Sequence, residues 1–384
     1  MSIRKSIFKP KELSALLKFK LEARRNEGSL KQLNHTKDES LQYCYDTLNK
    51  VSRSFAVVIR ELPQGLDDAV CLFYLILRAL DSIEDDMDLQ NDSKIELLRH
   101  FHLKNYEHGW SIEGVGDKEE YRELLANYHI VIEAFSKLDA KYQGIISDIC
   151  SKMGAGMADF SEKKINAIED YDLYCHYVAG LVGMGLSEIF AASGLENSSI
   201  SQYETRSNSM GLFLQKTNII RDYKEDLDES RIFWPREIWS TYALRLEDFS
   251  LEPEKKESLS CLNELVNNAL VHATDCLDYL KMLKNDRVFR FCAIPQVMAI
   301  ATLAEVYNNP KVFTENVKIR KGMAASLILN ANSIEDVVVI YKKMAETIRR
   351  KIPHNFPNSE TTNNLLNQIS SYCSLSLQET PEFK

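Results

Sequence analysis

Apolar residues recur about every three or four positions along most of the chain, which is the spacing of one helix face. Alternating apolar and polar residues are scarce, and only the β-branched stretch 311–330 is ambiguous between helix and strand. The pattern therefore predicts one all-α domain with a continuous core. The predicted helices lie near residues 40–50, 54–60, 65–86, 93–103, 119–135, 138–164, 169–194, 200–229, 235–240, 255–283, 288–307 and 333–352.

Composition supports long helices. The 384 residues include only Gly 14 and Pro 9, the two residues that most often interrupt helices. The formal net charge of -9 argues against a nucleic-acid partner, which would need a basic face. None of the eight cysteines belongs to a C-x-x-C pair, which excludes a zinc finger or dithiol motif and favours a reducing compartment.

The two ends of the chain differ from its middle. Residues 1–36 are basic, and their apolar stretch is broken by lysines, so a signal peptide is not predicted. Residues 353–384 are rich in Asn, Ser and Thr, and we expect a mobile tail there. The all-α domain should therefore span 37–352. Its most apolar stretches, 174–194 and 291–307, fall short of ~18 uninterrupted apolar residues and are predicted to be buried core helices.

An apolar helix ends in the acidic stretch "DSIEDDMD" at residues 81–88. Asp81, Glu84 and Asp85 are spaced i, i+3 and i+4, so they share one helix face. Most acidic clusters are simply solvated, but carboxylates this close need a cation if they are partly buried. An EF-hand is excluded, because its sixth and twelfth positions would be Asn91 and Leu97.

A second apolar helix ends the same way, in "MGLFLQKTNIIRDYKED" at residues 210–226. Asp222 and Asp226 are four apart, with Glu225 beside Asp226. Two matched clusters favour a bridging metal site over two solvated faces, and carboxylate oxygens suit Mg²⁺. Each nearby arginine alone could be an ordinary ion-pair partner, but four together favour a diphosphate. These arginines are Arg53, Arg78, Arg221 and Arg231.

Apolar helices that lead into acids and arginines fit an isoprenyl diphosphate. A metal would stabilise the departing diphosphate, and apolar and aromatic walls would keep water from the allylic cation. The chain has no G-x-x-x-x-G-K-[ST] phosphate loop and no G-x-S-x-G elbow, which excludes a P-loop NTPase and that hydrolase motif.

Several longer motifs make the chain resemble the squalene synthases (farnesyl-diphosphate farnesyltransferases) of the phytoene/squalene synthase family, from about residue 40 to about 350. The motifs are "SRSF" (52–55), "DSIED" (81–85), "YCHYVAGLVG" (174–183), "QKTNIIRD" (215–222), "DYKED" (222–226) and "FCAIPQVMAI" (291–300). The resemblance implies a single-domain isoprenoid-synthase bundle around a central apolar cavity. It also implies head-to-head joining of two farnesyl diphosphates into presqualene diphosphate. An NADPH-dependent rearrangement to squalene, the committed step toward sterols, would follow.

The resemblance also assigns roles to residues. Tyr174 would be the proton acceptor or cation-stabilising phenol of the first half-reaction, and Phe289 and Phe291 would shield the later cation. The residues that would hold Mg²⁺ are Asp81, Glu84, Asp85, Asp222 and Asp226. The residues that would contact diphosphate or NADPH are Ser52, Arg53, Ser54, Tyr74, Arg78, Gln215, Asn218, Arg221, Arg231, Lys318 and Arg320.

Alternative interpretations remain for several of these residues. Tyr174 could be an ordinary buried tyrosine, and Phe289 and Phe291 are two apart, so at least one could be a core residue. Arg290 stands where the family pattern leads us to expect a smaller polar residue. Lys318 and Arg320 would be surface charges without the resemblance.

Two other functions remain open. One is a related prenyl synthase that needs no NADPH, and the other is an inactive, prenyl-binding helical scaffold. The family usually has a C-terminal anchor in the endoplasmic reticulum membrane, with the catalytic domain on the cytosolic face. This chain ends at Lys384 without such a stretch, so either the anchor has been removed or this form is soluble. We separately expect a monomer.

Overall fold

The computed structural model describes residue 12 and residues 38–379, except for the side chains of Arg53, Ser54 and Glu379. Every regular element in these residues is helical, which confirms the predicted all-α class. Contacts divide the chain into two compact units, where the sequence suggests one domain. In the described residues, the N-terminal unit comprises 38–163 and 180–204, and the C-terminal unit comprises residue 12, 164–179 and 205–379.

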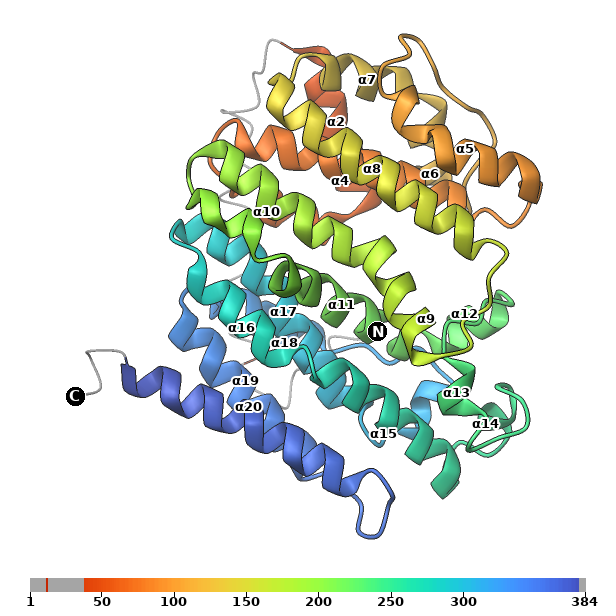
Figure 1. The fold of residues 1–384 in the computed structure, drawn as a ribbon, viewed down its shortest axis with the longest axis vertical. Helices are drawn as coiled ribbons and strands as arrows, with labels where there is room; N and C mark the ends of the chain where they lie inside the picture. Colours follow the sequence, from red (N-terminus) through yellow and green to blue (C-terminus); the bar gives the residue numbers. More distant parts are fainter. Residues whose placement is uncertain (1–11, 13–37, 380–384) are drawn as a thin grey trace. The chain divides into compact units, whose positions relative to one another are not determined.

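The N-terminal unit is a bundle of helices in which α5 and α8 lie side by side (Figure 1). Its elements are α2 (Glu39–Val51), α3 (Arg53–Ile59), α4 (Leu66–Asp85), α5 (Asn91–Lys104), α6 (Glu119–Ala126), α7 (Tyr128–Ser136), α8 (Ala140–Phe160), α10 (Leu181–Ser193) and the 3₁₀ turn η3 (Ser198–Gln202).

Two glycines explain how closely these helices pack. A Cβ at Gly154 of α8 would lie 2.2 Å from the Leu98 carbonyl oxygen of α5. A Cβ at Gly185 of α10 would lie 2.7 Å from Ile149 and 2.9 Å from Phe73. A larger residue at Gly154 would push the backbone of α5 away, and one at Gly185 would force the Ile149 and Phe73 side chains to shift. This packing fixes α4, the helix that carries the first acidic motif.

The C-terminal unit is also helical, and α19 and α20 lie side by side (Figure 1). Its elements are α9 (Ile168–Cys175), the π-helical turn η2 (His176–Gly180), α11 (Glu204–Arg221), α12 (Tyr223–Asp228), α13 (Arg236–Trp239), α14 (Asp248–Leu251), α15 (Lys256–Leu270), α16 (Ala273–Met282), α17 (Asp286–Val306), η4 (Pro310–Phe313), α18 (Lys321–Leu329), α19 (Ile334–Arg349) and α20 (Ser359–Glu379).

An aromatic cluster supports α12, the helix that carries the second acidic motif. The Tyr223 ring lies 4.8 Å from Trp234 and 5.2 Å from Phe313, measured between ring centroids. Phe249 contacts both Trp234 and Phe313. The Trp234 indole N–H also donates to the carbonyl of Ile219 in α11, at 3.2 Å. Rings from four segments thus hold the junction of α11 and α12 in place.

The prediction of a mobile tail from residue 353 is wrong for residues 359–379, which form α20. Its side chains Thr362, Leu366, Ile369 and Cys373 are fully buried or nearly so. They recur at helical spacing, and this stripe packs on the rest of the C-terminal unit. The polar composition between them concealed the pattern. The ambiguous stretch 311–330 is also resolved, since it holds η4 and α18.

In the part of the chain that the structure describes, two helical stretches have the length and hydropathy of a membrane span, Ile168–Ser193 and Asp286–Val306. In the second, 78% of the most apolar window is buried, which confirms the prediction of a core helix. In the first the buried share is 39%, so more of its surface is accessible than we expected. Length and composition alone are weak evidence for a span, because core helices pass the same test.

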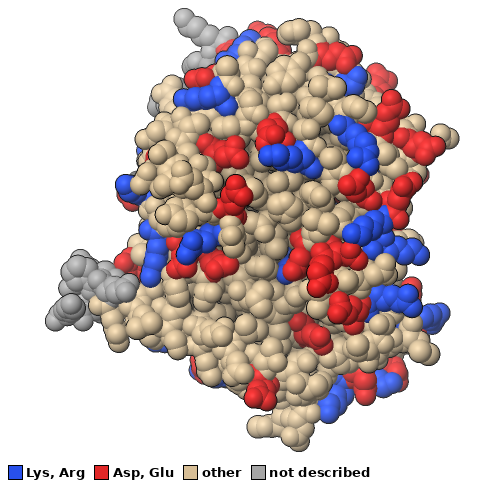
Figure 2. Space-filling model, viewed as in Figure 1, with Lys and Arg blue, Asp and Glu red and all other residues tan. Residues whose placement is uncertain are grey.

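Acidic and basic side chains are interspersed over the face drawn in Figure 2. Some of the ion pairs of the described residues are exposed and lie within one helix, such as Lys152 with Asp148 of α8 at 2.6 Å. Such pairs contribute about 0–1 kcal/mol each. They maintain a solvated surface and do not define the fold.

Candidate active site

The first acidic motif lies on the last turn of α4. Asp81, Glu84 and Asp85 are all half-buried, as their shared helix face predicts. The Arg78 guanidinium approaches the Asp81 carboxylate at 3.4 Å from one turn earlier. Burial raises the pKa of Asp81 to about 7; Arg78 opposes this shift, and the charge of Asp85 adds to it. One arginine therefore does not compensate for the burial of this carboxylate.

Aromatic rings hold the Arg78 guanidinium in place. Its central carbon lies 5.8 Å from the Tyr74 ring centroid and 5.4 Å from that of Tyr121. Tyr74 in turn packs on Phe55 of the "SRSF" motif, with the ring centroids 5.4 Å apart. Tyr121 was missed from the sequence, because it lies on a separate helix, α6, outside every motif.

The "SRSF" motif begins α3. Ser52 is the N-cap residue, and its hydroxyl accepts a hydrogen bond from the backbone N–H of Phe55 at 3.4 Å. Ser52 therefore has a structural role next to its predicted binding role. The side chains of Arg53 and Ser54, which we also predicted to bind substrate, lie outside the described residues.

Asp86 directly follows the acids of the first motif in sequence, but its role is structural. Its carboxylate accepts from the backbone N–H groups of Asp88 at 2.8 Å, Leu89 at 3.0 Å and Gly116 at 2.6 Å. Asp86 is only 5% exposed. It therefore closes the turn after α4 and ties the loop near residue 116 to it.

The second acidic motif lies where α11 ends and α12 begins. Asp222 is the N-cap residue of α12 and is paired with Arg221, whose Nε donates to Asp222 Oδ1 at 2.8 Å. Asp226 is 9% exposed and pairs with Arg231 at 3.0 Å. Burial raises the pKa of Asp226 to about 7; Arg231 opposes the shift, and Asp222 adds to it. This carboxylate resembles Asp81 in being insufficiently compensated.

Tyr174 is joined to the second motif through a ring. It lies on α9, is 6% exposed and stacks on Phe233, with the centroids 5.1 Å apart and the planes 20° apart. The Arg231 guanidinium lies 5.8 Å from the Phe233 centroid. The C-terminal unit thus brings Tyr174, Phe233, Arg231 and Asp226 into one row. Phe233 was missed from the sequence, since its only signal was its place two residues after Arg231.

Phe289 and Phe291 both lie on α17 and are 7% and 5% exposed. Arg290 between them hydrogen-bonds with its guanidinium to Asn332 Oδ1. The arginine that departs from the family pattern therefore turns its charge toward Asn332. Both rings are buried in the C-terminal unit, as a cation shield would require.

The segment before α18 touches the second acidic motif. Asn316 donates from its side-chain amide to Glu225 at 3.3 Å. Lys318 is exposed, whereas Arg320 pairs with Glu305 at 3.2 Å and with Glu12 at 3.0 Å. A phosphate at Arg320 would compete with these two carboxylates.

Gln215 and Asn218 lie on α11, before the second motif. Gln215 is half-buried and Asn218 is exposed. They are three apart, so they lie on one side of the helix. Arg221 is three positions further on, which makes a polar row on α11 that leads to Asp222.

The acidic residues fit Mg²⁺ in donor type. Within residue 12 and residues 38–379, the structure does not gather three His, Cys, Asp or Glu side chains into a preformed metal site. Mg²⁺ does not require one, because it usually binds through one or two carboxylates, waters and substrate phosphates. Burial raises the pKa of Asp81 and of Asp226, and a bound cation would stabilise both as carboxylates.

Comparison with known proteins identifies the family of the chain. The family model described as squalene/phytoene synthase matches residues 48–322. The squalene synthase of Rattus norvegicus is 46% identical over 370 residues, which cover 96% of this chain and 88% of the relative. Squalene synthase 3 of Panax ginseng is 46% identical over 95% of this chain and 86% of its own.

A solved structure agrees as well. The complex of TcSQS with the ligand BPH1237 superposes with a TM-score of 0.86 at 44% identity, over 88% of this chain and 99% of that chain. The fold and the acidic helix ends define an all-α enzyme of isoprenyl diphosphates. The chain belongs to the squalene/phytoene synthase family.

Proposed function

We propose that this chain is a farnesyl-diphosphate farnesyltransferase. It joins two farnesyl diphosphates head to head into presqualene diphosphate and then reduces and rearranges that product to squalene. The observation that carries the proposal is the pair of acidic helix ends, each with an arginine and a carboxyl whose pKa is raised to about 7. Membership of the squalene/phytoene synthase family supports it.

The acids and arginines handle the diphosphates. Asp81, Glu84 and Asp85 serve one diphosphate through Mg²⁺, and Asp222 and Asp226 serve the other. When bound, the metal supplies Lewis-acid stabilisation of the departing diphosphate. Arg78, held between two tyrosine rings, would contact phosphate oxygens directly. The further binding residues of this half-reaction are Ser52, Arg53, Ser54, Tyr74, Gln215, Asn218, Arg221 and Arg231.

Tyr174 completes the first half-reaction. The loss of diphosphate leaves an allylic cation, which must form the new carbon–carbon bond and then lose a proton. The Tyr174 phenol accepts that proton or stabilises the cation. Its burial keeps water away from the cation, and stacking on Phe233 limits where the ring can turn.

The second half-reaction uses other residues of the C-terminal unit. NADPH, when bound, supplies the hydride. Lys318 and Arg320 would hold its phosphates, and the buried rings of Phe289 and Phe291 would shield the carbocation from water. The link from Asn316 to Glu225 supports this role, because it ties the segment that carries Lys318 to the second acidic motif.

A product assay tests the proposal. The protein is incubated with farnesyl diphosphate and Mg²⁺, with and without NADPH, and the lipids are identified by mass spectrometry. We expect presqualene diphosphate without NADPH and squalene with it. A dehydrosqualene or phytoene product would instead indicate a related synthase, and no consumption of farnesyl diphosphate would indicate a scaffold.

We also propose that the protein works as a monomer at the cytosolic face of the endoplasmic reticulum membrane. Its family membership supports both statements. Fractionation of cells that express the protein, and sedimentation of the purified chain, would test them. Recovery in another compartment, or a stable dimer, would refute the respective statement.

A further inference from the structure

Lys216 is a buried lysine to which the proposed reaction assigns no role. It lies in the middle of α11 and is only 1% exposed. Its ammonium lies 2.7 Å from the Asp172 carboxylate, 3.0 Å from His272 Nε2 and 5.5 Å from the Tyr171 ring centroid. A lysine is rarely buried so completely unless its charge is paired, so this site has been built around it.

The groups behind Lys216 fix its position. Burial, followed by the nearby Lys216 charge, lowers the pKa of His272 to about 3, so its ring is neutral. Nε2 of His272 therefore accepts from Lys216, and Nδ1 donates to the Ser209 hydroxyl at 3.3 Å. That hydroxyl donates to Asp275 at 2.9 Å. Each donor has one acceptor, so the chain of hydrogen bonds holds Lys216 in one place.

Two polar pairs hold α9 against α11. Asp172 pairs with Lys216, and His176 Nδ1 lies 2.7 Å from Asn208 Oδ1. Asp172 comes four residues before His176, whereas its partner Lys216 comes eight residues after Asn208. Because the partners follow in reverse order, the two segments run in opposite directions. Tyr174 lies midway between the two pairs in sequence. The part of α9 that carries Tyr174 is thus held to α11 both before and after this residue.

A third link joins Tyr174 to the far end of α11. Its ring stacks on Phe233, above which lies Arg231, the partner of Asp226. Asp226 follows α11 directly, on α12. The α9 segment that carries Tyr174 is therefore connected to α11 directly, through Asp172 and Lys216. It is also connected to α12, which follows α11, through Phe233, Arg231 and Asp226.

We propose that Lys216, through its ion pair with Asp172, is a positioning residue that holds the Tyr174 phenol for the first half-reaction. The inference rests on the proposed function and deepens it. Lys216 itself touches no substrate. It acts by setting where α9 lies on α11, and a phenol displaced by about 1 Å can slow a reaction by up to about a hundredfold.

The test compares the two half-reactions in the same preparation of Lys216→Met. The first is followed as presqualene diphosphate formed from farnesyl diphosphate without NADPH. The second is followed as squalene formed from supplied presqualene diphosphate and NADPH. The ratio of the two rates does not depend on how much of the protein is folded. The matched control is Lys255→Met, which removes an exposed lysine paired with Glu252 at 2.8 Å in the same unit.

We expect Lys216→Met to lower the ratio of first to second half-reaction rates about tenfold or more, with the KM for farnesyl diphosphate within about threefold. Lys255→Met should leave the ratio unchanged, and Lys216→Arg should recover part of it. Asn208→Ala removes the other pair without changing a charge, and it should lower the ratio in the same direction. This variant keeps the test available if Lys216→Met does not fold.

An unchanged ratio in Lys216→Met, or in Asn208→Ala if the first does not fold, would overturn the positioning role. That result would leave the proposed function standing, because wild-type protein would still make both products. Failure of wild-type protein to consume farnesyl diphosphate would overturn the proposed function and this role together. The two failures are thus distinguishable.

Discussion

At the end of α4, the acids and their arginine lie on one continuous helix, whereas Asp222 and Asp226 lie on both sides of a helix break. Arg78 reaches Asp81 from one turn earlier in α4. Asp222 pairs with Arg221 at the end of α11, and Asp226 pairs with Arg231, which follows α12. Both motifs are therefore local in sequence, but the first lies on one helix and the second spans a helix break.

The two regions nevertheless reach a similar electrostatic state. Burial raises the pKa of one carboxyl in each to about 7, and the nearby arginine only partly opposes it. Buried carboxylates with too little positive charge cost stability in an isolated fold. Two separate occurrences in one chain are better explained by the same kind of ligand in each unit, a cation with its diphosphate, than by chance packing.

The largest effect should come from removing one acid in either region. Asp81→Asn and Asp222→Asn should each lower turnover by about a thousandfold or more, because the metal loses a ligand worth several kcal/mol in the transition state. The helical content should stay the same by circular dichroism. Asp88→Asn and Asp228→Asn, which change nearby exposed acids, are the matched controls. Near-normal turnover in either test variant would refute the metal assignment for that region.

The second-largest effect should come from removing Lys318, which we expect to impair the second half-reaction and not the first. Lys318 is on the segment that Asn316 ties to the second motif. Lys318→Ala should raise the KM for NADPH about tenfold, the value of one lost charged contact, while presqualene diphosphate formation changes little. Lys311→Ala, an exposed lysine paired with Glu315, is the control. An unchanged squalene yield at limiting NADPH would contradict the role of Lys318.

Much of this fold could be predicted because it is locally encoded. The α4 helix was predicted within one residue at each end, since its apolar periodicity continues up to the acids. The helix predicted at 200–229 covers α11 and α12 but missed the break between them at Asp222. The α20 helix was missed because Asn and Ser between its buried positions suggested a tail. Its stripe of Thr362, Leu366 and Ile369 is visible only when spacing is given more weight than composition.

Tertiary contacts in the site could not be predicted. Nothing in the sequence pairs Phe233 with Tyr174, or Lys216 with Asp172, because these partners are far apart in the chain. Asp86 shows the same limit at short range. It looks like one more acid of "DSIEDDMD", yet it accepts a hydrogen bond from Gly116, thirty residues away.

Asp86 therefore offers a contrast with the acid beside it. Asp86→Asn should lower the free energy of unfolding by about 1–3 kcal/mol, because an amide replaces a carboxylate that accepts three backbone hydrogen bonds. Turnover per folded molecule should stay within a few-fold. Asp85→Asn should show the reverse, with lost turnover and little change in stability. Urea denaturation together with turnover at saturating substrate would measure both, and equal behaviour of the two variants would contradict the division of roles.

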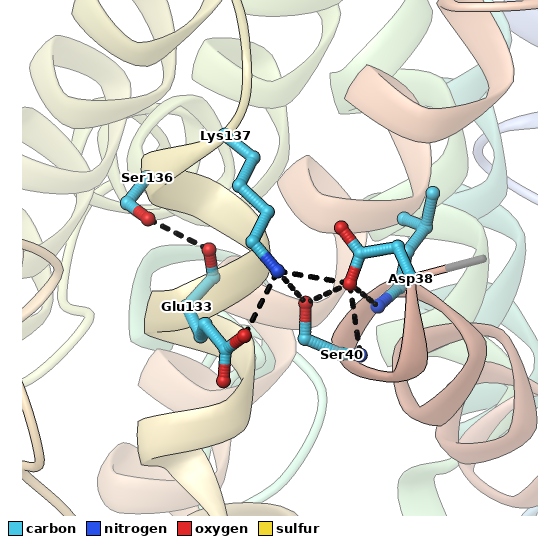
Figure 3. A network of polar contacts seen from close by, with 6 residues as sticks. Asp38, Ser40, Glu133, Ser136 and Lys137 are labelled. Atoms are coloured by element: carbon cyan, nitrogen blue, oxygen red, sulfur yellow. Dashed lines mark hydrogen bonds and ion pairs between the residues drawn. The ribbon is translucent and has the colours of Figure 1, made fainter. Parts of the chain in front are cut away.

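The smallest effect concerns Asp38, a carboxyl whose pKa is shifted the other way. As the N-cap residue of α2, it accepts from the Ser40 hydroxyl at 2.6 Å and the Ser40 N–H at 3.0 Å, and Lys137 lies 2.9 Å away (Figure 3). The hydrogen bonds from Ser40 and then Lys137 lower the pKa of Asp38 to about 2. This carboxylate is satisfied by the protein itself, whereas Asp81 and Asp226 are not.

The sign of the shift fixes the pH dependence. A folded pKa of about 2 lies below the unfolded value of about 3.9, so the stability that Asp38 contributes is present above about pH 4 and is lost as the pH falls toward 2. Asp38→Ala should therefore cost about 1 kcal/mol at neutral pH, the value of an N-cap, and almost nothing near pH 2. Thermal unfolding of both proteins at the two pH values would measure this, with the exposed Asp46→Ala on α2 as control. A difference that persists at low pH would mean that the Asp38 side chain stabilises α2 by packing rather than by charge.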